Sequence, residues 1–496
     1  MFIKELDCEV FKNINCKNLP SLRRNIVYQF LYELLIVFIP LFTIPYVSRV
    51  LGAENIGLFS YTYAVANYFV LFANLGIKNY GSRTIAMVRN NKEELNRNFS
   101  EILSIHIIFS IIVIFVYLVL LFFFVEDNLV IFLIQSIYVF AAVFDINWFF
   151  FGIEKFKLTV GRNTLVKILS VFLVLVFVKT QTDLWIYALI LALSVFVGQS
   201  VVWFALKQYV SWRRPSWANM KQHIRPLFVL FLPILALSLY KYMDKIMLGS
   251  ISSNVQVGFY ENAEKIINVP MSLIMAFGVV LMPRIANMVT SKDKGEVFKL
   301  IDMSMEAVML LAIAISFGLA GISFVLAPIF FGYEFEECGI LIMGLAVTVP
   351  FMAFANVIRT QYLIPYKEDK IFVVSLFLGA AVNLIVNIIL IPYMAARGAV
   401  IGTIFAEIIV CIYQSYFVRK KIFIKKYLLN TIPPILIGIV MFVFVFQIGN
   451  VMNINIVTLI LQLLVGMFIY AVGVFLLMLK SRTRLMVLLR KFVVRY

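Results

Sequence analysis

Long apolar runs separated by short polar loops constrain this chain more than any other feature of its sequence. A helix that crosses a membrane needs about 20 apolar residues, and the 496-residue chain has room for about fourteen such runs. Hydrocarbon offers no hydrogen bonds to a backbone, so runs of this length form helices. Only 14% of the residues are charged, against about 25% in soluble domains. The sequence therefore predicts an all-α polytopic membrane protein with no soluble domain.

The expected spans follow one another without long interruptions. They cover residues 25–48, 57–80, 101–125, 128–151, 158–179, 183–206, 226–249, 257–283, 302–330, 338–365, 371–391, 395–418, 428–448 and 455–479.

Lysine and arginine gather in every second loop. The two tails and the alternate loops between them hold 33 of these residues, whereas the intervening loops hold only Arg49, Lys179 and Arg397. Positive charge marks the cytoplasmic side of short loops, so we expect both termini in the cytoplasm and an even number of spans. The same bias accounts for the net charge of +17, which therefore does not indicate a nucleic-acid partner.

An internal repeat divides the chain. Gly57 and Arg83 have the same separation as Gly258 and Arg284, and Asn67 matches Asn268 at the same offset of 201 residues. Since each half has six spans, both insert in the same orientation and are expected to be related by an axis along the membrane normal. The predicted parts are a cytoplasmic tail (1–24), a first lobe (25–206), a basic interlobe loop (207–225), a second lobe (226–418), two peripheral helices (428–479) and a basic tail (480–496).

Several charged side chains lie within the apolar runs. A charge at the centre of a membrane helix costs about 2.5–3.5 kcal/mol, and such residues face a bundle interior or a wet cavity. Lys167, Lys241 and Arg359 lie furthest from the expected interfaces, so we predict that they line one water-filled cavity. Lys245 shares a helical face with Lys241 and Asp244 and is a further candidate for the substrate cavity, although it lies near enough to the outer interface to reach water there.

The remaining polar candidates within the spans are amides and acids. Amides of this kind bind sugars or hydrogen-bond between helices, and the acids pair with lysines or carry a coupling proton. The amide candidates are Asn67, Asn268 and Asn356, and the acidic candidates for coupling or charge balance are Glu33, Asp145, Asp244 and Glu264. The four cysteines and two histidines lack metal-ligand spacing, so we expect no metal and no cofactor, and we place His223 in a solvated loop.

Three segments carry a resemblance to a known family. They are SRVLGAENIGLFSYTYAVANYFVLFANLGIKNYGSRTIA, DINWFFFGIEKFKLTVGRN and MDKIMLGSISSNVQVGFYENAEKI. The chain resembles the polysaccharide-unit (Wzx-type) flippases, whose superfamily also includes multidrug and toxic-compound extruders and the lipid II flippase.

The resemblance implies a substrate and a setting. The cargo would be an undecaprenyl-diphosphate-linked oligosaccharide of O-antigen, capsule or exopolysaccharide, moved across the bacterial inner membrane by alternating access. The implied partners are this lipid-linked oligosaccharide, membrane lipids, and a polymerase and other glycan-assembly proteins. Fixed cations in a wet cavity suit a diphosphate, and the planar guanidinium of Arg359 suits a phosphate pair.

Two other functions compete with a flippase. A multidrug extruder of the same superfamily would favour acidic or aromatic cavities, whereas the deep charges here lean cationic. A membrane enzyme such as a polymerase would need long outer loops with catalytic residues. The outer loops are short, and the sequence shows no P-loop, nucleophile elbow or metal motif. The kind of ion that couples to transport stays open.

Overall fold

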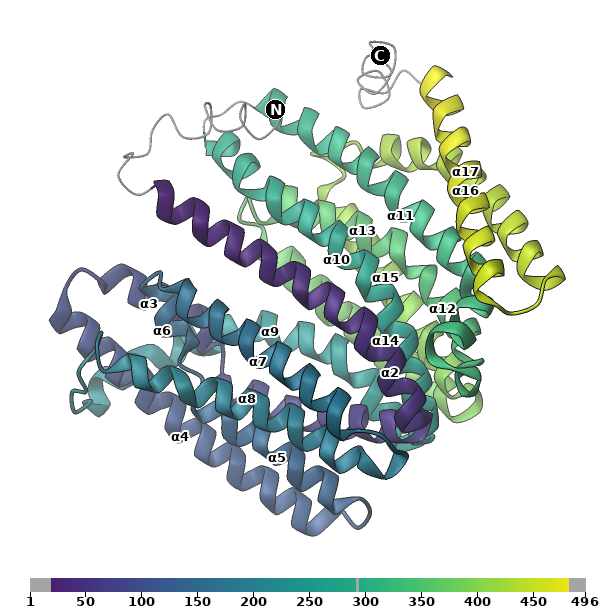
Figure 1. Cartoon of the computed structure of the whole chain (residues 1–496). Coiled ribbons are helices and arrows are strands. Elements are labelled where there is room, and N and C mark those ends of the chain that lie inside the picture. The colour runs from purple at the N-terminus through teal and green to yellow at the C-terminus, as the bar shows by residue number, and fades with distance from the viewer. Residues whose placement is uncertain (1–18, 291–293, 481–496) are drawn as a thin grey trace.

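All regular elements of the described part of the chain are helices (Figure 1). The structure is a computed structural model that describes residues 19–290 and 294–480. Most of both predicted tails lies outside these ranges.

The helices follow one another with short connections. In chain order they are α2 (Leu19–Asn74), α3 (Ile77–Val88), α4 (Lys92–Phe124), α5 (Leu129–Val143), α6 (Asn147–Gly152), α7 (Phe156–Phe177), η1 (Gln181–Asp183), α8 (Leu184–Leu206), α9 (Trp217–Ile251), α10 (Asn254–Thr290), α11 (Lys294–Phe331), η2 (Tyr333–Phe335), α12 (Cys338–Ala346), α13 (Thr348–Ile358), η3 (Arg359–Leu363), α14 (Asp369–Met394), α15 (Ala396–Val418), α16 (Ile424–Val451) and α17 (Ile456–Lys480).

Helix α2 contains two of the predicted spans. Its 56 residues would measure about 84 Å as one straight helix, far more than the hydrocarbon thickness of about 30 Å. Gly52, with φ 76°, interrupts the helical backbone between the two arms. Within the described residues, 13 helical stretches are long and apolar enough to cross a membrane, and the first of them, Phe42–Val88, includes this break. The prediction of an all-α polytopic membrane protein with about fourteen helices is confirmed.

Some boundaries differ from those expected. Helix α9 begins at Trp217, so the second half of the 207–225 segment is helical and not a loop. The placement of His223 in a solvated loop was wrong, because its ring is 3% exposed and bonds to Tyr80 of α3 and Glu101 of α4. The run at 338–365 is divided into α12, α13 and the π-helical turn η3.

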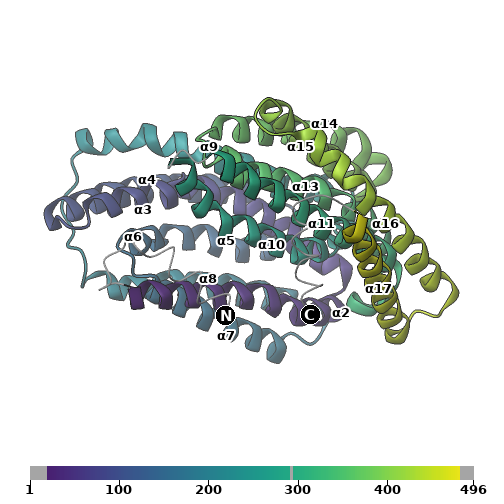
Figure 2. The ribbon, with the colours of Figure 1, turned by 90° about the horizontal axis from the view of Figure 1, so that it is seen from above.

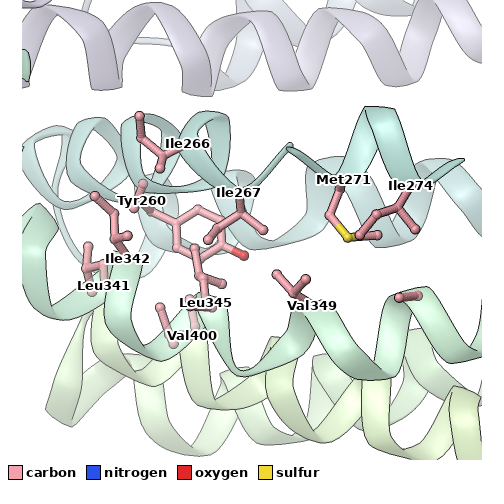
Figure 3. Packing of buried hydrophobic residues seen from close by; sticks show 14 of the residues in the cluster. Tyr260, Ile266, Ile267, Met271, Ile274, Leu341, Ile342, Leu345, Val349 and Val400 are labelled. Atoms are coloured by element: carbon pink, nitrogen blue, oxygen red, sulfur yellow. The ribbon is translucent and has the colours of Figure 1, made fainter. Parts of the chain in front are cut away.

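The largest core cluster packs α10 against α12, α13 and α15. Figure 3 shows Tyr260, Ile267 and Met271 of α10 opposite side chains of the other helices, which include Leu345 and Val400. Lipid tails are as apolar as these side chains, so close packing and interhelical hydrogen bonds, rather than removal from water, favour this arrangement. Helices α16 and α17 lie at one side of the bundle beside α11 (Figure 2).

Helices α2 and α10 cross very closely at the end of the bundle opposite the basic loops. A Cβ atom on Gly57 would lie 1.6 Å from the carbonyl oxygen of Asn254, and one on Gly258 would lie 2.1 Å from that of Ala53. The two contacts are equivalent under the repeat, because the 201-residue offset relates Ala53 to Asn254 as well as Gly57 to Gly258. Such a reciprocal contact is what two repeats make at a twofold axis. We call this crossing the α2–α10 seam.

Candidate functional site

Lys167 lies on α7, is exposed, and lines a cavity of about 270 Å³. The walls come from both arms of α2 and from α7, α8 and α10, so the cavity touches both lobes of the predicted repeat. Lys265 of α10 also lines it, together with hydroxyl and amide groups of Ser60, Ser170 and Asn262. Among the residues that the structure describes, none forms an ion pair with Lys167. The cavity therefore has a wall of apolar, hydroxyl and amide groups, and no acid among the described residues compensates the charge of Lys167.

Lys245 has a different environment. Its Nζ lies 2.5 Å from Glu261 and 2.8 Å from Glu264, both on α10, and its side chain is 8% exposed. Lys265 lies 3.1 Å from Glu261. The two lysines and two glutamates form one cluster, which we call the ion cluster. The two positive and two negative charges of the cluster balance. Glu261 and Glu264 together compensate the charge of Lys245.

Glu261 was not among the candidates from the sequence. Its separation of four residues from Lys265 places both on one face of α10, and this spacing is the signal that could have identified it.

Asp244 is buried in a ring of polar side chains from three other helices. Its Oδ2 accepts hydrogen bonds from the hydroxyls of Tyr260 at 2.6 Å and Thr403 at 3.0 Å, and its Oδ1 accepts one from Asn387 at 2.5 Å. Asn383 accepts a further hydrogen bond from Asn387. Among the described residues no lysine or arginine pairs with this carboxylate, so neutral donors alone surround a buried acid.

Lys241 and Arg359 are not among the residues that line the cavity of Lys167. Lys241 is exposed, and its ammonium lies 5.3 Å from the centroid of the Tyr242 ring. Arg359 belongs to η3, donates to Asn356 Oδ1 at 2.8 Å and lies 5.2 Å from the centroid of Phe372. A single water-filled path that joins the three cations stays a prediction.

Asn67, Asn268 and Asp145 are not among the residues that line the cavity. Asn67 donates to the Tyr63 carbonyl within its own helix at 2.9 Å, and Asn268 is exposed on α10. Asp145 accepts hydrogen bonds from the backbone and side chain of Asn147 at 3.0 and 2.6 Å. The side chain of Glu33 lies outside the part of the structure that is described.

A group of aromatic rings adjoins the cavity, and no signal in the sequence indicates it beyond a high aromatic content. Phe59 and Tyr63 stack at 5.6 Å, and Phe59 contacts Tyr187 edge-on at 4.9 Å. Tyr138 contacts Tyr63 at 5.1 Å. Phe59 and Tyr187 line the cavity itself. These aromatic faces and hydroxyls come from α2, α5 and α8, segments far apart in the chain.

A larger hollow lies on the side of the second half. Its volume is about 950 Å³, and it lies between α11, α16 and α17, with Pro270 of α10 at its edge. Its walls are almost wholly apolar, with Gln462 and Tyr470 as the polar exceptions. A long hydrocarbon chain fits such a surface better than a sugar or a phosphate does.

The fold is that of a class of membrane transporters. The structure is similar to a solved structure titled "Lipid II flippase MurJ, inward closed conformation", with a TM-score of 0.69, 16% identity, and coverage of 90% of this chain and 97% of that one. It is also similar to an inward-facing multidrug resistance MATE family transporter, with a TM-score of 0.60, 13% identity, and coverage of 79% and 97%. At these identities the likeness establishes the fold alone.

Sequence comparison gives the family. Residues 22–289 match the family described as "Polysaccharide biosynthesis protein". This match covers more than half of the 496 residues, and the chain belongs to this family. A Shigella dysenteriae relative named "Putative O-antigen transporter" is 24% identical over 408 residues, with coverage of 79% of this chain and 99% of the relative. The chain is thus a membrane transport protein of polysaccharide biosynthesis and not an enzyme.

Proposed function

We propose that this protein flips undecaprenyl-diphosphate-linked oligosaccharide units from the cytoplasmic to the outer leaflet of the bacterial inner membrane. The observation that supports this proposal is the position of Lys167 in the wall of the cavity between the lobes, where no described residue forms an ion pair with it. A cation in a wet interior lowers the cost of moving a diphosphate through about 30 Å of hydrocarbon. The names of the relatives, an O-antigen transporter and a lipid II flippase, support the same class of cargo.

Each part of the cargo has a matching region. The diphosphate is drawn to Lys167 and Lys265, with Lys241 and Arg359 along the route. The sugars pack against the rings and hydroxyls beside the cavity, where Tyr187 lies in the wall. The polyprenyl tail occupies the apolar hollow between α11, α16 and α17. This division keeps the apolar tail out of the wet interior that the charged headgroup needs.

Alternating access requires the α2–α10 seam to separate. The excess of basic residues in alternate loops supports cytoplasmic termini, and with that orientation the seam would close the outer side. A cross-link between α2 and α10 beside Gly57 and Gly258 is expected to stop export, and its reduction is expected to restore it. Export that continues with the cross-link in place would contradict this route.

Asp244 is the candidate for coupling. A buried carboxylate with only neutral donors around it either takes up a proton or holds a cation, because an isolated charge in a low dielectric is costly. Asp244→Asn keeps the size and one acceptor oxygen, replaces the other oxygen with a donating amide, and removes the charge. We expect this variant to fold and to lose the dependence of export on the ion gradient.

Complementation of a transport-deficient strain tests the function. Lys167→Ala, Lys241→Ala and Arg359→Ala are each expected to lower export of the glycan at normal protein levels, while Lys167→Arg retains much of it. Arg359→Lys retains part, since it keeps the charge but loses the bidentate geometry. The matched control is Lys207→Ala, an exposed lysine outside the route. Normal export by all three alanine variants would overturn the cationic route, and efflux of cationic dyes without glycan export would favour a multidrug extruder.

A further inference from the structure

A second polar cavity lies at the basic end of the bundle, away from the cavity of Lys167. Its volume is about 680 Å³, and its walls come from α3, the start of α4 and the start of α9. Three arginines line it, one from each helix: Arg83, Arg97 and Arg225. We call it the arginine pocket.

The three arginines have no acidic partners among the residues that the structure describes. Other arginines at the same end do: Arg89 lies 2.6 Å from Glu154, and Arg213 lies 3.1 Å from Glu93. Three like charges that converge on one cavity repel one another. Their convergence is therefore favourable when an anion occupies the space between them, and guanidinium groups bind phosphate oxygens in pairs.

A buried hydrogen-bonded chain fixes the floor of the pocket. His223 Nδ1 lies 2.6 Å from the Tyr80 hydroxyl, and His223 Nε2 lies 2.9 Å from Glu101 Oε2. His223 and Glu101 are 3% and 1% exposed. These contacts join α3, α4 and α9, the three helices that carry the arginines. Glu101 bonds to the histidine, and among the described residues it forms no ion pair with any of the three arginines.

The rim of the pocket is apolar on one side. Met87 of α3 is 68% exposed, and Val229 of α9 is 58% exposed. Both line the pocket with Pro226 and Leu230. The arginines therefore lie beside exposed apolar side chains, at the level where the basic loops begin. This combination suits a ligand with a phosphate head and a hydrocarbon tail better than it suits a free anion.

We propose that the arginine pocket binds the diphosphate headgroup of a polyprenyl-linked lipid in the leaflet at the basic end of the bundle. The pocket would hold the cargo before it enters the interior, and in this respect the inference rests on the proposed function. Three convergent arginines favour a diphosphate over a phosphodiester, because the diphosphate offers more charge and more acceptor oxygens.

Equilibrium binding to the purified full-length protein tests this assignment. The protein is placed in nanodiscs of phosphatidylcholine, and the probes are a polyprenyl diphosphate, phosphatidylglycerol and inorganic pyrophosphate. The triple variant Arg83→Gln, Arg97→Gln, Arg225→Gln is expected to bind the polyprenyl diphosphate about tenfold more weakly or worse. The control Arg89→Gln, Arg213→Gln removes two paired arginines at the same end and is expected to bind as the unmodified protein does.

Each other outcome overturns the assignment. If the triple variant binds the polyprenyl diphosphate as tightly as the unmodified protein, the three arginines do not bind it. If the control pair loses as much affinity, the effect comes from overall charge and not from the pocket. Phosphatidylglycerol binding as tight and as arginine-dependent as that of the diphosphate would make the occupant a membrane phospholipid. If pyrophosphate binds as tightly as the full lipid, the apolar rim does not contribute to binding.

A labelling experiment avoids the arginine changes and any effect they have on folding. In a chain without its native cysteines, Met87→Cys is expected to react with a maleimide more slowly when the polyprenyl diphosphate is present. Leu158→Cys, exposed on α7 outside the pocket, should react at an unchanged rate. No protection at Met87→Cys overturns the proposal. If Met87→Cys is protected but Lys167→Ala exports normally, the arginine pocket is supported. The proposed role of the Lys167 cavity is then contradicted.

Discussion

Lys167 and Lys245 are both lysines at membrane depth, yet the structure places them in opposite circumstances. Lys167 of α7 lines a cavity, is exposed, and has no acidic partner among the described residues. Lys245 is enclosed by Glu261 and Glu264 and is 8% exposed. A free cation is available to an anionic cargo, whereas an enclosed one holds helices together. The comparison shows that depth in the membrane does not by itself identify a ligand-binding charge.

The largest expected effect is on the ion cluster. Lys245→Met leaves the partly buried Glu261 and Glu264 close together without their shared cation. Removing one member of a buried ion pair costs about 3–5 kcal/mol, so we expect a large fall in the unfolding temperature of the purified protein. Thermal unfolding in detergent measures it. A change as small as that of a surface lysine would mean that water reaches the cluster freely, and the distinction from Lys167 would fail.

Removing all the charges of the cluster except Lys265 sharpens the comparison. In the triple variant Lys245→Met, Glu261→Gln, Glu264→Gln no acid is left uncompensated, and Lys265 still reaches the cavity. Replacing a buried ion network by neutral groups is often close to neutral for stability. We expect the triple variant to recover at least half of the stability lost in Lys245→Met. If it is less stable than the single variant, the cluster stabilises the fold through more than charge balance.

The sequence predicted the helical class, the number of spans and the repeat, because apolar length and charge asymmetry are local properties. The cargo-binding role that it predicted for Lys167 stays a prediction. The sequence did not reveal that Lys245 is paired, since Glu261 lies 16 residues away in the chain and the pairing depends on how α9 packs against α10. The burial of His223 was missed for the same reason, because its partners Tyr80 and Glu101 come from the first half. Which charges meet across helices is decided by tertiary packing.

Lys265 lies between the two cases, since it pairs with Glu261 at 3.1 Å and also lines the cavity, with 33% of its side chain exposed. Lys265→Gln removes one of two cations next to Glu261, while Lys245 still compensates that acid. We expect a destabilisation of about 1 kcal/mol together with a partial loss of export. An unfolding measurement and an export assay on the same preparation separate the two effects. A loss of stability equal to that of Lys245→Met would assign Lys265 wholly to the ion cluster.

The smallest effect on stability is expected at Lys167, where the effect on export should be large. Lys167→Met removes a charge on an exposed side chain, and no carboxylate among the described residues is left without a partner. Substitutions of this kind change stability by about 0.5 kcal/mol or less, so the unfolding temperature should stay close to that of the unmodified protein. Export should fall, because the diphosphate loses a cation on its route, and Lys167→Arg should restore much of it. The opposite pattern, a destabilised protein with normal export, would show that Lys167 is a structural residue like Lys245. In that case the cargo-binding charge would have to be sought at Lys241 or Arg359.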